Sequence, residues 1–231
     1  MSLDKFCYKI FHIPGYGESA TERSVLFTDL DTYLSKRIDR LNTETVLIND
    51  ENSYFEFNDK HNLIKTSREF KWGEIGIWAS NLLAIKNFLD TDKEYLMLME
   101  DDIHVSDKEK FISLLENYMD LLPEGWDIFS YFVHENQFTR FQNKQAYSDV
   151  VPAYQDWSML CYILNKKSAK KFLDISLTHG ITMPIDWFVY RQPDTFKSYT
   201  LHPLAEKGCK LYDIVSTFQH RESGHPVPEK R

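Results

Sequence analysis

The sequence predicts an α/β protein with three layers, in which helices cover both faces of a mostly parallel central sheet. Short apolar runs, typical of buried strands, alternate along the chain with longer segments of helical periodicity. Such alternation is characteristic of parallel sheets with helical crossovers. The chain has 231 residues, 42% of them hydrophobic, and no repeat or low-complexity linker divides it. We therefore expect a single domain over residues 1–231.

The first fifty residues predict the opening of a βαβ unit. Residues 6–13 are expected to form the first strand, which ends at the turn Pro14–Gly17. Apolar positions recur at helical spacing over residues 21–41. Thr45–Ile48 then form a short strand that leads into a polar loop from Asn49 to Ser53.

The middle of the chain predicts two helices on either side of a strand. Gly73–Leu89 is apolar around most of its circumference, which indicates a helix buried between layers. It leads into a strand at 95–99. Ser106 and Glu109 have the spacing of a capping box, and we expect a helix from there to Leu122.

The second half continues the pattern and then weakens. Strands are expected over Trp126–Phe132 and Ser158–Leu164, and a further helix begins at Asn165. Residues 133–157 are polar and aromatic without a clear period, which favours a long loop, often a binding element. Beyond Pro193 only loops or short strands are expected.

An acidic triplet, Glu100-Asp101-Asp102, directly follows the apolar run Tyr95–Met99. Ligands of open α/β sheets bind at the carboxyl ends of strands, where this triplet lies. If the backbone stays extended, Glu100 and Asp102 face one way and Asp101 the other. Converging carboxylates repel one another unless a divalent cation or protons neutralise them. The triplet therefore predicts a metal site, with a solvated turn or the first turn of a following helix as the structural alternatives.

Composition excludes several classes of function. The 35 acidic and 27 basic residues give a net charge of −8, which argues against wrapping duplex nucleic acid, since such binding needs a basic footprint. Its three cysteines match neither a zinc signature nor a disulfide framework. No secretory signal and no run near the ~18 apolar residues of a membrane span is found. We expect a soluble cytoplasmic protein without a nucleic-acid partner, of open oligomeric state.

Five segments follow one another between residues 70 and 190. They are Gly73-Glu-Ile-Gly76 with Ser80, Tyr95–Asp102, Leu122–Asp127, Cys161–Phe172 and Pro184–Trp187. Together they resemble glycosyltransferase family 25, which holds bacterial lipooligosaccharide galactosyltransferases and collagen galactosyltransferases. The resemblance implies a GT-A-like, Rossmann-like fold, a nucleotide-sugar donor, a divalent ion and inversion at the sugar carbon. It also implies a donor-binding half at 1–105 and an acceptor-binding half at 106–231.

The resemblance assigns roles within the triplet. Asp102 would hold the metal ion, Mn²⁺ or Mg²⁺, directly, and Glu100 would contact the metal, the ribose or a metal-bound water. Asp101 would orient the donor sugar. The chain departs from the family in its loop Pro14–Arg23, which holds a single arginine where the family commonly has several.

Inverting transfer requires a general base that takes the proton of the acceptor hydroxyl. Asp186 is the candidate, because neighbouring apolar and aromatic groups would desolvate its carboxylate and raise its basicity. The alternative is that Asp186 caps a helix of Trp187–Tyr190. Trp187 itself is a candidate to stack on a sugar ring.

A late segment of GT-A folds usually completes the metal shell. Here Phe218–His225 supplies histidines, and His220 is the candidate ligand, with His202 and His225 as alternatives. Each of them also fits a solvated surface histidine or an acceptor contact.

The end of the first strand is the usual place for a nucleotide base. His12 and Tyr16 lie there, and Tyr16 is expected either to stack on uracil or to pack in the turn. Gly73 and Gly76 do not form a Walker phosphate loop, and they are expected to allow close approach of the helix near the donor.

The sequence therefore predicts a metal-dependent inverting glycosyltransferase. It would move a hexose, galactose or glucose, from a UDP-linked donor to a glycan or glycoprotein acceptor. One alternative is a nucleotidyltransferase or sugar-nucleotide hydrolase, although the basic Gly-rich signature of that class is missing. The other alternative is an inactive carbohydrate- or nucleotide-binding protein of the same fold, although the acidic triplet and Asp186 are intact.

Overall fold

The computed structural model describes residues 2–16, 19–66, 70–132, 148–153, 159–192 and 194–211. Within them lies a seven-stranded sheet of order β2-β1-β3-β7-β5-β8-β6. Its strands are β1 (Phe6–Phe11), β2 (Asp39–Arg40), β3 (Tyr95–Glu100), β5 (Ile128–Ser130), β6 (Val150–Pro152), β7 (Cys161–Asn165) and β8 (Ser198–Leu201). Five strands share one direction, and β6 and β7 run against them. The prediction of a mostly parallel sheet is confirmed, with two reversed strands added.

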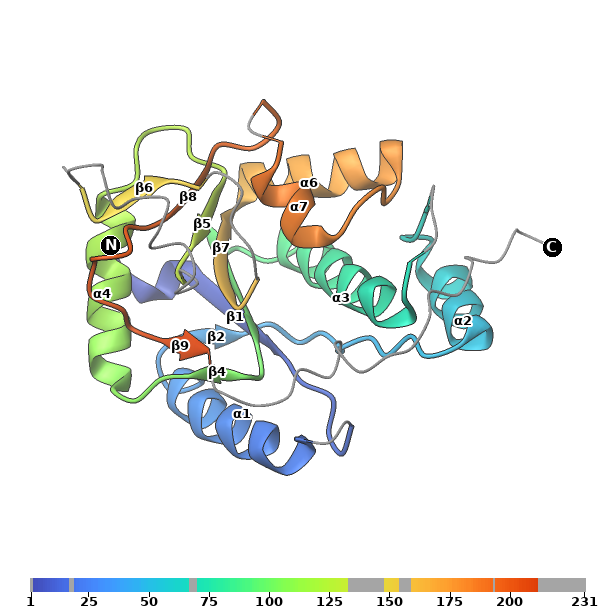
Figure 1. Cartoon of the computed structure of the whole chain (residues 1–231), viewed down its shortest axis with the longest axis horizontal. Coiled ribbons are helices and arrows are strands. Elements are labelled where there is room, and N and C mark those ends of the chain that lie inside the picture. Colours follow the sequence, from blue (N-terminus) through green and yellow to red (C-terminus); the bar gives the residue numbers. More distant parts are fainter. Residues whose placement is uncertain are drawn as a thin grey trace.

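Helices cover both faces of the sheet, as predicted (Figure 1). On one face lie α3 (Trp72–Leu89), α6 (Lys166–His179) and α7 (Ile185–Tyr190), and on the other lie α1 (Ala20–Leu34) and α4 (Lys108–Asp120). The remaining elements are a 3-10 turn at Leu3–Lys5, the helix α2 (Glu51–His61) and a two-stranded sheet of β4 (Ile103–His104) and β9 (Lys210–Leu211).

Side chains of β3 alternate between the two layers of the core. Leu96 and Leu98 pack in the cluster beneath α3, and Met97 and Met99 pack in the cluster beneath α1 and α4. All four are fully buried. A strand that is buried on both faces explains why this segment is apolar throughout rather than alternating in polarity.

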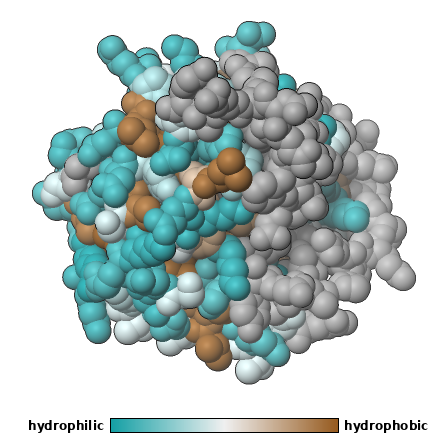
Figure 2. All heavy atoms as spheres, turned by 60° about the vertical axis from the view of Figure 1, so that its left-hand side comes forward, coloured by the Kyte–Doolittle hydropathy of each residue, from teal (hydrophilic) through white to brown (hydrophobic). Residues whose placement is uncertain are grey.

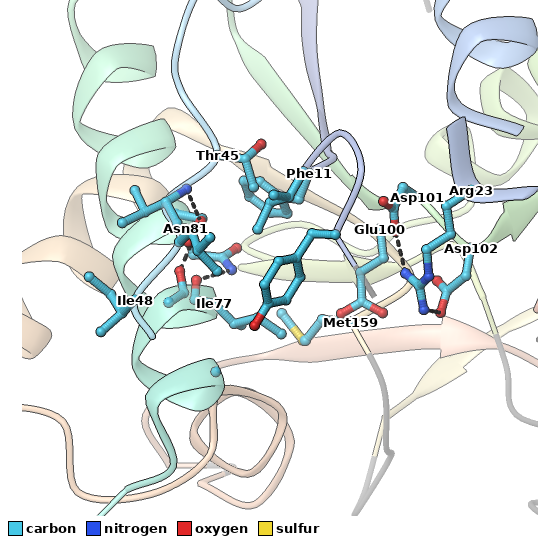
Figure 3. Close-up of a pocket in the computed structure, with 17 residues that line it drawn as sticks. Phe11, Arg23, Thr45, Ile48, Ile77, Asn81, Glu100, Asp101, Asp102 and Met159 are labelled. Atoms are coloured by element: carbon cyan, nitrogen blue, oxygen red, sulfur yellow. Dashed lines mark hydrogen bonds and ion pairs between the residues drawn. The ribbon is translucent and has the colours of Figure 1, made fainter. Parts of the chain in front are cut away.

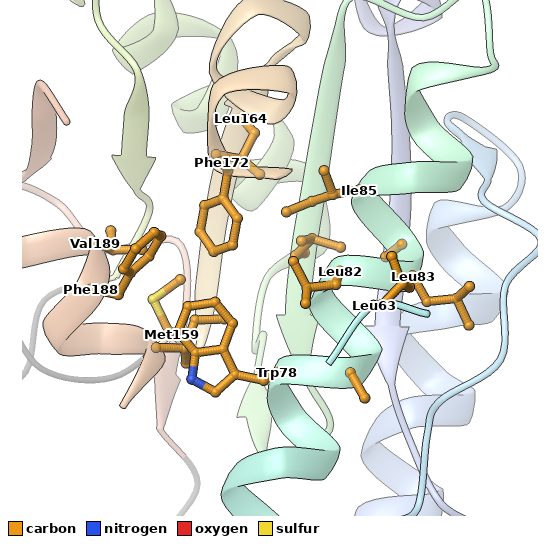
Figure 4. Close-up of a cluster of buried hydrophobic side chains, with 14 of the residues drawn as sticks. Leu63, Trp78, Leu82, Leu83, Ile85, Met159, Leu164, Phe172, Phe188 and Val189 are labelled. Atoms are coloured by element: carbon orange, nitrogen blue, oxygen red, sulfur yellow. The ribbon is translucent and has the colours of Figure 1, made fainter. Parts of the chain in front are cut away.

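Trp78 anchors α3 to the neighbouring helices (Figure 4). Its ring contacts the rings of Phe172 in α6 and Phe188 in α7, with centroids 5.7 and 5.1 Å away. Its indole N–H donates to the backbone oxygen of Met183 at 3.0 Å. This packing fixes the position of α7, which carries Asp186, relative to α3.

The expected strand at Thr45–Ile48 is wrong. The second strand, β2, instead lies earlier in the chain, and it pairs in parallel with β1. Val46 donates its backbone N–H to the side-chain oxygen of Ser80 at 2.8 Å rather than to a neighbouring strand. Because a side chain takes this bond, the segment runs alongside α3 without joining the sheet.

Three helix boundaries also differ from prediction. The first helix ends at Leu34 rather than 41. The polar loop at 49–53 in fact begins α2, whose N-cap Asp50 accepts the backbone N–H of Ser53 at 2.8 Å. The helix α4 is capped by Asp107 rather than Ser106, because the Asp107 carboxylate accepts the backbone N–H of Lys110.

The coloured part of the surface in Figure 2 is largely hydrophilic, with isolated apolar residues. Large apolar side chains that are exposed within the described ranges are Val25, Leu121, Trp187 and Leu204. Scattered residues of this kind are ordinary on a folded protein. Across the same ranges, no helix has both the length and the apolar character to cross a membrane.

Candidate active site

A cleft opens at the carboxyl ends of β1 and β3, where Phe11 pairs with Glu100 (Figure 3). It encloses about 820 Å³, counting its open mouth. One wall is the extended segment Thr45–Ile48, and another is the first part of α3, from Gly73 to Asn81. The acidic triplet lies at one end. The place of the cleft in the sheet suits a small-molecule ligand.

The cleft collects five of the eight site residues that the sequence predicts, namely Tyr16, Gly73, Glu100, Asp101 and Asp102. His12 lies behind the lining, against Asp101. Asp186 lies on α7 and outside the lining. His220 lies outside the described residues.

Gly76 and Ser80 hold the extended wall against α3. A Cβ atom on Gly76 would lie 3.1 Å from the backbone oxygen of Val46 and 3.3 Å from the backbone nitrogen of Ile48. One turn later, the Ser80 hydroxyl accepts from Val46 and donates to the backbone oxygen of Gly76 at 2.8 Å. The predicted close approach at Gly76 is therefore present, and it is an approach of the extended segment to α3.

The backbone turns after Glu100, so the expected alternation along an extended strand does not occur. Asp101 and Asp102 instead both contact the guanidinium of Arg23, Asp101 through Nη1 and Asp102 through Nη2 at 3.4 Å. Arg23 belongs to the first turn of α1, and only 5% of its surface is exposed.

Arg23 is the residue that sequence reasoning missed. A signal for it was present, because it is the single arginine of the loop where the resembling family has several, and three adjacent carboxylates need a cation. Nothing in the local sequence, however, indicates that Arg23 pairs with Asp101 and Asp102, which follow it by 78 and 79 positions.

Both carboxylate oxygens of Asp101 have partners. Arg23 contacts Oδ1, and the Nδ1 of His12 lies 2.8 Å from Oδ2. The His12 ring stacks on Phe27, with centroids 4.5 Å apart, and its Nε2 lies 3.3 Å from the Ser24 hydroxyl. The structure thus places His12 behind Asp101 and surrounds it with residues of α1.

Asp102 is only half partnered. Its Oδ2 faces Arg23, whereas its Oδ1 is buried and has no hydrogen-bond partner among the described residues. Burial raises the pKa of Asp102, and the Arg23 charge opposes that change. A buried carboxylate oxygen without a partner is costly, and a cation or a water that binds it would remove the cost.

Glu100 holds its proton unusually strongly. Burial, followed by the charges of Asp102 and Asp101, raises its pKa from 4.5 to about 8, and Arg23 offsets part of this effect. The Asp186 carboxylate is close enough to contribute to the same rise in the pKa of Glu100. The four acids therefore share one electrostatic environment, although they come from β3, the turn after it and α7.

Asp186 lies inside the first turn of α7 rather than at its cap. The N-cap residue is Pro184, without a side-chain cap bond, so the capping alternative is wrong. The Asp186 Oδ1 accepts the backbone N–H of Trp187 at 2.9 Å. Trp187 is 36% exposed, and the guanidinium of Arg191 lies 3.7 Å from its ring centroid.

Comparison with known proteins decides the family. The family model described as "Glycosyltransferase family 25 (LPS biosynthesis protein)" matches residues 31–189, more than half of the chain. The chain belongs to glycosyltransferase family 25. It is a glycosyltransferase, which implies a nucleotide-sugar donor and a glycan acceptor. The search of curated proteins gave no match.

Two solved structures resemble the transferase weakly. A197 from STIV aligns at 12% identity with a TM-score of 0.43, over 92% of this chain and 86% of that one. Mouse xyloside xylosyltransferase 1, in its apo form, aligns at 11% identity with a TM-score of 0.32, over 84% of this chain and 63% of that one.

The acids of the transferase can be tested against the divalent ion that its family implies. Within the described ranges, no three Asp, Glu, His or Cys side chains form a complete metal-binding group. Mg²⁺ commonly uses only one or two protein carboxylates and takes its other ligands from substrate phosphates and water. Glu100 and the unpartnered oxygen of Asp102 meet that smaller requirement.

Proposed function

We propose that this glycosyltransferase is metal-dependent and inverting, and that it moves a hexose from a UDP-linked donor to a glycan or glycoprotein. The observation that carries the proposal is the unpartnered, buried Oδ1 of Asp102 beside Glu100 in the cleft. Of the described residues that line the cleft, all but Met159 belong to residues 1–105, which supports their assignment as the donor-binding half.

Glu100 and Asp102 are the residues that would hold Mn²⁺ or Mg²⁺. The bound ion would neutralise the charge that develops on the departing diphosphate. His220 is the proposed third protein ligand. Support comes from β9, whose Leu211 pairs with Ile103, the residue directly after Asp102, so the chain passes this site nine residues before His220.

Residues of the cleft walls are proposed to position the donor. Tyr16 is proposed to stack on the base, and Gly73 allows the donor to approach the start of α3 closely. Asp101 supports the donor sugar indirectly, because both its oxygens are already bound to Arg23 and His12. Galactose and glucose remain the proposed sugars.

Asp186 is the proposed general base. Its carboxylate takes the proton of the acceptor hydroxyl while that oxygen attacks the anomeric carbon of the donor. The bond from that carbon to the diphosphate oxygen breaks on the opposite side, which inverts the configuration. Support comes from the effect of Asp186 on Glu100, since the base must lie near the donor.

Thermal unfolding with UDP, GDP and CMP, each with and without Mn²⁺, tests the proposal. A ligand that binds only the folded state at a hundred times its Kd adds about 2.7 kcal/mol of stability. We expect UDP and Mn²⁺ together to raise Tm more than the sum of their separate effects. D102A should lose this synergy, and D92A, at an exposed acid, should keep it. No metal-dependent shift with any nucleotide would contradict the proposal.

A further inference from the structure

We infer that His12 and Arg23 are positioning residues of the donor site, which brace Asp101 so that Asp102 presents one free carboxylate oxygen to a divalent cation. The inference rests on the proposed function. It adds Arg23, which sequence reasoning missed, and it gives His12 a positioning role in place of the nucleotide-base contact that the sequence suggested. Neither residue is required to touch the donor. They act through the two aspartates that follow β3.

The brace is a closed ring of contacts. Arg23 contacts one oxygen of Asp101, and His12 contacts the other at 2.8 Å. His12 in turn contacts the hydroxyl of Ser24, the residue that follows Arg23 in α1. A ring that closes through adjacent residues of one helix cannot rotate at one contact without straining the others. Asp101 is therefore held from two sides, independently of any ligand.

His12 also connects the ring to the extended wall of the cleft. Its backbone N–H donates to the Thr45 hydroxyl at 3.2 Å, and its ring is held against Phe27. Its side chain is only 6% exposed. A histidine this well buried, and stacked behind the lining, is placed to orient a neighbour rather than to bind a nucleotide base directly.

Arg23 transmits the brace to Asp102. Its two terminal nitrogens contact different aspartates, so fixing Asp101 also fixes the plane of the guanidinium. That plane leaves Asp102 with one oxygen engaged and the other unpartnered. Without the brace, the neighbouring carboxylates of Asp101 and Asp102 would repel each other, and the contact that orients Asp102 would be lost. A lysine cannot substitute, because a single ammonium does not span both carboxylates in a fixed plane.

Two substitutions of His12 separate positioning from folding. H12F keeps an aromatic ring against Phe27 and removes the nitrogen that faces Asp101. H12N loses the ring but keeps a side-chain N–H donor near the place of Nδ1. H61F is the matched control, because His61 also packs on a phenylalanine, Phe57, and faces a carboxylate, Glu44 at 3.6 Å, while neither His61 nor Glu44 lines the cleft.

The readout is the Kd of Mn²⁺ at saturating UDP, from the electron paramagnetic resonance signal of free Mn²⁺. Loss of groups that orient metal ligands commonly weakens metal affinity by about 10- to 100-fold. We expect about tenfold weakening or more in H12F and R23K, near wild-type affinity in H61F, and substantial recovery in H12N. Tm in EDTA checks that each variant folds. A folded H12F that binds Mn²⁺ as tightly as H61F would overturn the brace.

Failure of the proposed function would give a different result from failure of the brace. In that case wild-type protein would bind no Mn²⁺ in the presence of UDP, whatever residue occupies position 12. The brace then has its own metal-free test in the ¹⁵N spectrum of His12. We expect the proton on Nδ1 in the wild type and a changed tautomer balance in D101N. A spectrum that D101N leaves unchanged would overturn the brace directly.

Discussion

The Ser80 hydroxyl accepts the backbone N–H of Val46 at 2.8 Å, and this bond links a buried helix to the extended wall of the cleft. Both groups are buried. The contact takes the place of a strand-to-strand bond, so it decides where the wall lies. Ser80 therefore acts together with Gly76, one turn earlier in α3, on the same extended wall.

S80A should therefore weaken both stability and donor binding. Leaving a buried N–H without an acceptor costs about 1–3 kcal/mol, and we expect a loss of that size in urea unfolding. UDP affinity should fall as well. S176A is the control, because Ser176 is equally buried and donates to the backbone oxygen of Phe172 in the same way, but lies in α6 outside the cleft. Equal losses of UDP affinity in both variants would contradict this role for Ser80.

G76A should impair nucleotide binding more than folding. The added methyl group meets the backbone of Val46 and Ile48 at 3.1–3.3 Å, so the wall must move by a few tenths of an ångström. Alanine regains about 1 kcal/mol of helix propensity, which offsets part of the strain. We expect Tm to change little and the Kd of UDP, by calorimetry, to rise several-fold. K86A, on the exposed side of the same helix, should leave the Kd unchanged.

The parts of the fold that the sequence predicts well are those with strong local signals. Tyr95–Glu100 and Trp72–Leu89 are predominantly apolar segments, and both elements form within one residue of the expected bounds. Thr45–Ile48 has the composition of a strand, but its hydrogen bonding depends on Ser80, which is distant in sequence. The capping signal of Asp50 and Ser53 was present, yet α2 buries only Tyr54 and Phe57, too few residues for a clear helical period.

In the candidate site, too, the features with a strong local signal are the ones that the sequence predicts. The triplet was visible because three acids follow one strand, and the cleft does form around it. The roles within it depend on the turn at Asp101 and on Arg23, and neither follows from alternation along a strand. Long-range ion pairs of this kind become visible only once the helix α1 is placed against the sheet.

Stability of the metal-free protein should fall as pH rises from about 5 to 8, through the contribution of Glu100. In the folded state Glu100 keeps its proton up to about pH 8, whereas its ordinary pKa is 4.5. The folded state therefore binds more protons than the unfolded state in this window, so raising the pH favours unfolding. The difference in unfolding free energy between E100Q and wild type, measured in EDTA, should grow in favour of E100Q between pH 5 and 8.

E124Q provides the comparison, because Glu124 is exposed on the turn after α4. The difference in unfolding free energy between E124Q and wild type should stay constant over the same pH range. A difference between E100Q and wild type that is equally flat would show that Glu100 titrates normally in the folded protein.

Substitution of Asp186 should separate donor binding from sugar transfer. D186N keeps an acceptor for the Trp187 N–H, so α7 should stay folded, but it removes the carboxylate that takes the acceptor proton. General-base catalysis contributes roughly 10²- to 10⁴-fold, and we expect kcat for transfer to fall by that range. The Tm increase with UDP and Mn²⁺ should persist. Transfer is measured as release of UDP from UDP-galactose and UDP-glucose with p-nitrophenyl β-galactoside as acceptor. D194N, at an exposed acid beyond α7, should transfer normally, and a D186N protein with more than a tenth of wild-type kcat would exclude Asp186 as the base.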